Sequence, residues 1–287
     1  MNRRDFIKTA LIAAPVAAVT ARLSAPKTAD SAKWEKMNDE RILDTRCIDC
    51  SYITYAPFVM KDPNTGAMSG LFYDLTQKIG ELADLEMNWS METTYATYAE
   101  DLREKKCDIF AGGIWPDSKR AKVANFSDGA FYSSLGVYVR ADDRRFNGYL
   151  DQLNDPQYRF ATIDGEMSQI IKESDFPHAA AYGMPDSADI SLLAESVATR
   201  KADVTIVERG VANLYMRHNS GSLRNLTETK PLRVFKNTWA YAYDAPRVGG
   251  ILNTAIEEMI FNGYVDKVLA KYEPAPGSFY RVREPIE

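Results

Sequence analysis

Hydrophobic positions in the first half of the chain alternate between strand and helix patterns. Leu71, Leu75 and Ile79 stand at helical spacing, whereas Met87 and Trp89 alternate with polar residues as in a strand. The predicted elements are a strand at 42–48, a helix at 71–85, a strand around 87–89, a helix at 98–105 and a strand at 108–111. This order is typical of a parallel sheet with helices on both faces.

A second α/β set lies between two aromatic-rich strands, 133–139 and 238–243. Its predicted elements are a strand at 160–163, a helix from 168, a helix at 189–200, a strand at 203–207 and a helix from 211. A final helix, 248–272, follows and is interrupted by Gly263. The pattern therefore predicts two α/β units, one inserted in the other.

The first 25 residues have the pattern of an export signal. The apolar run Thr9–Val19 follows a positive start and is too short to span about 30 Å of hydrocarbon as a helix. The start, Arg3–Lys8, resembles the twin-arginine export motif. We expect cleavage after Ala21 or Ala25, with no cysteine at either cut to carry a lipid anchor. A buried amphipathic helix is the alternative interpretation.

Composition narrows the class of partner. The 287 residues are 45% hydrophobic and 26% charged, which is typical of a folded chain. No run of 18 or more apolar residues predicts a membrane span. The formal net charge is −5, and removal of the four basic and one acidic residues in 1–25 would make it −8. The acidic balance argues against a nucleic-acid partner and favours a small molecule or a protein.

The cysteines Cys47, Cys50 and Cys107 leave three interpretations open: a disulfide between two of them, buried thiols, or a metal or redox role. Cys47 and Cys50 have the spacing of a metal or redox pair, but the sequence has no second pair of cysteines at this spacing. His178 and His218 are the only histidines, which excludes a zinc site with several imidazoles. We expect no metal and no cofactor.

Several short motifs follow one another in the order of a known protein family. They are Tyr55-Ala56-Pro57-Phe58, Gly70-Leu71-Phe72-Tyr73-Asp74-Leu75, the segment 106–112, Arg120 with Phe126-Ser127-Asp128, Asp164-Gly165 and the segment 201–208. With these residues the chain resembles the extracytoplasmic solute-binding proteins of amino-acid ABC transporters, family 3, over about residues 42–273. The first two motifs are similar to the family's Tyr-Pro-Pro-Phe and Gly-Phe-Asp-Val-Asp-Leu.

The resemblance implies an α/β fold, the two-lobed periplasmic-binding-protein fold of type II. Each lobe would be a doubly wound, mainly parallel sheet, and two crossing strands near 138–140 and 235–239 would join the lobes over a cleft. The expected domains are a signal peptide at 1–25, a tether at 26–41, lobe 1 at 42–138 and 239–273, lobe 2 at 139–238 and a C-terminal tail at 274–287.

The resemblance also implies a ligand site at the carboxyl ends of the strands. Arg120 matches the family's carboxylate clamp, and Glu208 falls where an acid holds the ligand's ammonium. Tyr55 and Tyr95 fall where aromatic rings pack against the ligand side chain. Each residue also has a structural interpretation: a surface arginine, a helix-capping acid, or aromatic lid or core packing.

Three positions depart from the family pattern, because Trp115, Asp117 and Glu166 stand where small hydroxyl residues are usual. The other expected ligand-binding residues are Gly113, Gly165 and Ser168. A ligand carboxylate near Asp117 and Glu166 would be repelled unless Arg120 dominates, whereas a cation would be favoured by both charge and aromatic rings. We therefore expect a ligand of net positive or amine character.

The family implies a monomeric periplasmic protein that closes on a small-molecule solute and delivers it to the membrane subunits of an ABC permease. Two other functions stay open. A periplasmic accessory or sensor protein with a degenerate pocket fits the missing hydroxyls. A dehydratase on the same scaffold could use Glu208 as a general acid, but no matched cleft position is a histidine and no nucleophile has a base partner.

Overall fold

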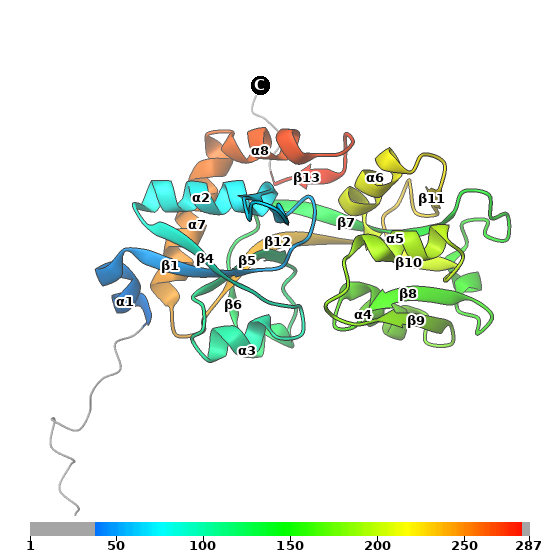
Figure 1. Ribbon diagram of the computed structural model, residues 1–287, viewed down its shortest axis with the longest axis horizontal. Helices are drawn as coiled ribbons and strands as arrows, with labels where there is room; N and C mark the ends of the chain where they lie inside the picture. The colour runs from blue at the N-terminus through cyan, green and yellow to red at the C-terminus, as the bar shows by residue number, and fades with distance from the viewer. Residues whose placement is uncertain (1–37, 283–287) are drawn as a thin grey trace, which may run out of the picture. The chain divides into compact units, whose positions relative to one another are not determined.

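The computed structural model describes residues 38–282, so the expected signal peptide and residues 26–37 of the expected tether lie outside the described residues. In the first lobe, β1 runs parallel to β4 and β5 (Figure 1). The strands of this lobe are β1 (Cys47–Tyr52), β2 (Met60–Lys61), β3 (Met68–Ser69), β4 (Glu86–Glu92), β5 (Ile109–Ile114) and β6 (Asn125–Phe126). Its helices are α1 (Asn38–Thr45), α2 (Leu71–Ala83), α3 (Tyr98–Arg103), the short 3-10 helix Arg120–Lys122, α7 (Pro246–Phe261) and α8 (Tyr264–Tyr272).

The second lobe repeats this arrangement, since β8 runs parallel to both β9 and β10. Its strands are β8 (Arg159–Ile163), β9 (Ala180–Met184), β10 (Val204–Glu208) and β11 (Leu223–Asn225). Its helices are the 3-10 helix Leu150–Leu153, α4 (Met167–Asp175), α5 (Ser191–Ala198) and α6 (Arg209–His218). The predicted α/β fold with two lobes is confirmed.

Strand β5 shows why helices cover both faces of the first sheet. Ile109 and Ala111 belong to the hydrophobic cluster that contains α2, whereas Phe110 belongs to a second cluster with Tyr98 and Leu102 of α3. Successive side chains of a strand point to opposite faces, so a strand that is apolar at every position must be buried on both. The carboxyl end of β5 is thereby held between two layers.

Two long strands, β7 (Phe131–Arg140) and β12 (Arg233–Tyr241), join the lobes. Strand β12 pairs with β7 up to Asn237 and with β5 from Thr238. This change of pairing partner lies within the expected crossing at 235–239. Strand β7 already pairs with β10 of the second lobe from Leu135. The crossing expected at 138–140, and the lobe boundary at 138, are therefore placed too late. Strand β7 is almost entirely buried, so its hydrophobicity does not mark the change of partner.

The start of the folded part also differs from expectation. Residues 38–41, expected in the tether, begin α1, and the strand expected at 42–48 is helix up to Thr45 and strand only from Cys47. Ile42 is fully buried, and Asp39 accepts hydrogen bonds from the backbone N–H groups of Arg247 and Val248 at the start of α7. These long-range contacts fix the helix.

The expected tail also forms part of the fold. Within it, β13 (Phe279–Arg281) pairs with β7, and the buried ring of Phe279 packs edge to face against Phe58 and Phe131. The cysteines are unpaired thiols in the structure, with Cys50 and Cys107 buried.

Candidate ligand-binding site

A small cavity lies where the strands of both lobes end. It is lined by Tyr55, Phe58, Tyr95, Gly112, Gly113, Ile114, Trp115, Arg120, Glu166, Met167, Glu208 and Asn237. The first lobe contributes the loop after β1 and the end of β5, and the second contributes the residues after β8 and the end of β10. Its volume is about 20 Å³, which is the space of roughly one or two water molecules.

The aromatic wall of the cavity comes from the first lobe. The ring centroids of Tyr55 and Tyr95 lie 6.2 Å apart, edge to face, and Tyr55 packs in the same way on Phe58 at 5.4 Å. Gly113 has a φ of 80°, and a Cβ there would lie 2.5 Å from the Phe72 ring. A glycine is therefore required at the end of β5, where the backbone meets the cavity.

Arg120 reaches the cavity because its own loop holds it. Its Nη1 donates to the Trp115 carbonyl oxygen at 3.1 Å, and its Nε lies 3.3 Å from Asp117 Oδ2. Asp117 also accepts the backbone N–H groups of Lys119 and Arg120, and its side chain is 43% exposed. Asp117, expected to face the ligand, instead lies outside the cavity and orients Arg120.

Glu208, at the end of β10, is a buried carboxylate that connects both lobes. Its Oε2 accepts a hydrogen bond from Tyr55 Oη at 2.8 Å, and its Oε1 accepts one from Ser133 Oγ at 2.5 Å. Burial raises the pKa of Glu208 to about 7, and the charge of Glu166 adds to this, although both hydrogen bonds act in the opposite direction.

Glu166 supplies a second buried acid. It precedes α4 as the capping residue and accepts the backbone N–H of Ser168 at 2.6 Å. Burial raises the pKa of Glu166, and the hydrogen bonds from Ser168 and the charge of Arg120 oppose the rise. Ser168 itself does not line the cavity, because its Oγ accepts the N–H of Ile163. Gly165 is also outside the lining, with a φ of 75° that allows the turn into α4.

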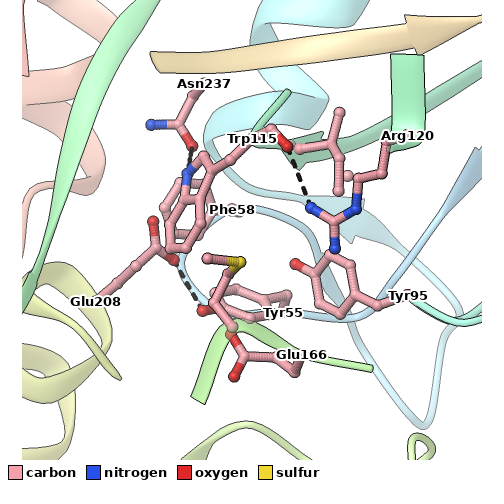
Figure 2. A pocket seen from close by; sticks show the side chains of 12 residues that line it. Tyr55, Phe58, Tyr95, Trp115, Arg120, Glu166, Glu208 and Asn237 are labelled. Carbon is pink, nitrogen blue, oxygen red and sulfur yellow. Dashed lines mark hydrogen bonds between the residues drawn. The ribbon is translucent and has the colours of Figure 1, made fainter. Parts of the chain in front are cut away.

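Trp115 contacts the second lobe as well as the cavity. Its ring stacks on Phe235 of β12 with centroids 4.6 Å apart, and its Nε1 donates to Asn237 Oδ1 at 3.1 Å. Figure 2 shows Glu208 and Arg120 at opposite sides of the cavity, with Tyr55, Tyr95 and Glu166 around them. One guanidinium and two carboxyl groups therefore face the same enclosed space.

Five lining residues are not among those expected from the sequence, namely Phe58, Gly112, Ile114, Met167 and Asn237. Asn237 is the informative omission, because it is a buried amide at the first position of the fully buried part of β12, Asn237–Ala240. Buried polar groups need partners, so a polar residue at this position could have been recognised as part of a buried network.

Residues 38–282 contain no group of three or more His, Cys, Asp or Glu side chains that could hold a metal ion. In the same part of the chain, no helix combines the length and the hydropathy that crossing a membrane requires.

Comparison with known proteins decides the family. Residues 50–275 match the bacterial extracellular solute-binding proteins, family 3. The chain belongs to this family. Solved structures with the same fold include an ancestral amino acid-binding protein, a precursor of cyclohexadienyl dehydratase, which is 20% identical with a TM-score of 0.71 over 82% of this chain and 98% of that chain.

Two further structures of this fold are those of proteins that bind amino acids. An ancestral arginine-binding protein bound to arginine is 21% identical, with a TM-score of 0.68 over 79% of this chain and 97% of that chain. The solute receptor for L-cysteine of Neisseria gonorrhoeae is 14% identical, with a TM-score of 0.71 over 84% and 98%. At these identities the likeness concerns the fold.

A curated relative, the membrane-bound lytic murein transglycosylase F of Salmonella typhi, is 25% identical over 156 residues. The match covers 53% of this chain and 32% of the relative, so the chain spans about a third of that protein's length.

Proposed function

We propose that this family 3 protein captures a small, amine-bearing, amino-acid-like solute between its lobes. The observation that carries the proposal is that Arg120 from one lobe and Glu208 from the other line the same buried cavity. A guanidinium is suited to a carboxylate, and a buried carboxylate to an ammonium. An α-amino acid offers both groups at fixed separation.

The charge balance selects among amino acids and amines. Nε of Arg120 is already paired with Asp117, and Nη1 uses one of its two hydrogens on the Trp115 carbonyl oxygen. The other Nη1 hydrogen and Nη2 are therefore left for a ligand carboxylate. Glu166 adds a second negative group without a salt-bridge partner among the described ion pairs. With both acids ionised the cavity carries a net negative charge, which favours a solute with an additional cationic group. The tyrosine rings favour the same solute through cation–π contact.

Binding requires the lobes to separate and close. A cavity of about 20 Å³ is too small for an amino acid, so entry must break the Tyr55–Glu208 hydrogen bond that joins the lobes. A solute that contacts Arg120 and Glu208 together interacts favourably with a closed arrangement and less with an open one. Ligand binding then shifts the population towards closure.

We extend the proposal to the cellular role: export through the twin-arginine route into the periplasm and delivery of the solute to an ABC permease. The second candidate is an accessory or sensor protein. It is favoured by the small cavity, one wall of which is the Trp115 ring that stacks on Phe235. Catalysis of the dehydratase kind has one supporting feature, the buried Glu208 with a pKa of about 7.

A thermal-shift screen tests the proposal. Lysine, arginine and aliphatic diamines should raise the unfolding temperature, because a ligand that binds only the folded state stabilises it. Arg120→Ala should abolish the response to the amino acids. Lys119→Ala is the matched control, since it removes a positive charge from an exposed position in the same loop. If no amino acid or amine shifts the transition, the accessory function replaces the transport function.

A further inference from the structure

Four buried side chains form a continuous line of hydrogen bonds through both crossing strands. Trp115 Nε1 donates to Asn237 Oδ1 at 3.1 Å, Asn237 Nδ2 donates to Ser133 Oγ at 2.9 Å, and Ser133 Oγ donates to Glu208 Oε1 at 2.5 Å. Each of these residues is at most 8% exposed. We call Trp115, Asn237, Ser133 and Glu208 the donor chain.

The direction of the donor chain follows from its first member. An indole N–H can only donate, so the Asn237 oxygen must face Trp115 and the Asn237 NH₂ group must face Ser133. That NH₂ group can only donate, so the Ser133 oxygen accepts and the Ser133 hydrogen is left for Glu208. Oε1 of Glu208 is thus always an acceptor, and a proton on Glu208 must lie on Oε2, next to Tyr55.

We propose that Ser133 and Asn237 are positioning residues that hold Glu208 as an ammonium acceptor, so that capture of a cationic solute releases a proton from Glu208. The inference rests on the proposed function for its ligand. The donor chain stabilises the ionised carboxylate through Oε1 and leaves Oε2 as the only place for the proton. A ligand ammonium competes for that place.

The other groups around Glu208 set the pH range of this exchange. The phenol of Tyr55 faces it from the loop after β1, the phenol of Tyr95 from the loop before α3, and Glu166 from the start of α4. The positive charge of Arg120 acts to lower the pKa values of Tyr95 and Glu166. Arg209 donates a hydrogen bond to the Glu228 carbonyl oxygen. Burial and Glu166 hold the pKa of Glu208 at about 7, so about half of the molecules carry the proton at neutral pH.

The structure contains a matched pair of serines for the test. Ser133 and Ser134 are neighbours in β7, both at most 1% exposed, but the Ser134 hydroxyl has no hydrogen-bond partner within residues 38–282. Ser133→Ala removes a donor to the ionised carboxylate, so the pKa of Glu208 should rise by about one unit. Ser134→Ala should leave the pKa unchanged. Asn237→Leu, one link further away, should act in the same direction as Ser133→Ala.

Carbon-13 NMR of glutamate-labelled protein without ligand reads this pKa directly, with Glu208→Gln assigning the resonance. Calorimetry with L-lysine in buffers of different ionisation enthalpy then counts released protons. We expect about half a proton per lysine at pH 7, fewer at pH 8.5, and affinity falling by up to about tenfold per pH unit below 7.

The outcomes separate the two proposals. If Ser133→Ala and Ser134→Ala give the same Glu208 pKa, the donor chain has no positioning role, whether or not lysine binds. If the pKa responds as expected and lysine binds without proton release, the coupling is wrong. If the pKa responds and neither L-lysine nor L-arginine binds, the proposed function fails, and the coupling to solute capture fails with it, while the positioning of Glu208 stands.

Discussion

Replacing Glu208 by glutamine tests whether a buried carboxylate opposes closure of the cleft. Burial, with a smaller contribution from Glu166, raises the pKa of Glu208 from 4.5 to about 7. The folded protein therefore binds more protons than the unfolded chain between these pH values, so the free energy of unfolding decreases as pH rises through this window. Below pH 4.5 Glu208 is protonated in the folded and the unfolded state, so its carboxyl group no longer lowers the free energy of unfolding.

The size of the effect follows from the shift. About 2.5 pH units, at about 1.4 kcal/mol each, correspond to roughly 3 kcal/mol. Glutamine stays neutral and can keep both contacts, since its oxygen can accept from Ser133 and its amide can donate to Tyr55. We expect Glu208→Gln to exceed the wild-type free energy of unfolding by up to about 3 kcal/mol at pH 8. This is an upper limit, because opening of the lobes would hydrate the carboxylate.

Urea unfolding at pH 4, 6 and 8 measures this difference. Glu257→Gln is the control, because Glu257 lies exposed on α7. The higher free energy of unfolding of Glu208→Gln should appear between pH 4 and 8 and be absent from Glu257→Gln. A variant that is less stable than wild type at pH 8, or a gain of equal size at pH 4 and pH 8, would mean that the buried charge of Glu208 does not destabilise the folded protein. The same variant should bind lysine far more weakly, so stability and binding are expected to oppose each other.

Two further substitutions test the geometry of the cavity. At Gly113 φ is 80° and a new Cβ would lie 2.5 Å from Phe72, whereas at Gly277 φ is 79° and the space around a new Cβ is open. Both Gly→Ala variants share a backbone strain of roughly 1–3 kcal/mol. Gly113→Ala should therefore lower the free energy of unfolding by more than this amount. Equal losses in urea unfolding would contradict the contact argument. Tyr55→Phe removes the hydrogen bond from Tyr55 to Glu208 between the lobes and should increase the radius of gyration in X-ray scattering at pH 8. Tyr98→Phe is the control, because the buried Tyr98 phenol has no hydrogen-bond partner in the described chain, and it should leave the radius of gyration unchanged. A similar increase in both variants would mean that the Tyr55–Glu208 hydrogen bond does not hold the lobes together.

The parts of the fold that depend on local pattern could be predicted from sequence. Helix α2 was predicted from Leu71, Leu75 and Ile79, which are all fully buried. The ends of parallel strands were also predicted, and with them the convergence of Gly113 and Glu208 on one cavity. These features follow from periodicity and from strand order, which are visible in the chain itself.

The parts that depend on distant partners could not be predicted. Helix α1 depends on Asp39 contacting the start of α7, and β13 depends on Phe279 reaching Phe58 and Phe131. The fate of Asp117 was missed for another reason. A short acid followed by two free backbone N–H groups forms hydrogen bonds within its own loop, and this local satisfaction keeps it out of the cavity.

Calorimetric titration at pH 8 tests the central claim most directly, namely that Arg120 and Glu208 hold a cationic amino-acid-like solute between the lobes. L-Lysine, L-arginine and L-glutamate should be titrated into the wild-type protein and into Glu208→Gln. We expect binding of lysine or arginine, weaker or no binding of glutamate, and loss of the cationic preference in the variant. Preferential binding of glutamate, or an unchanged affinity for lysine in Glu208→Gln, would contradict it.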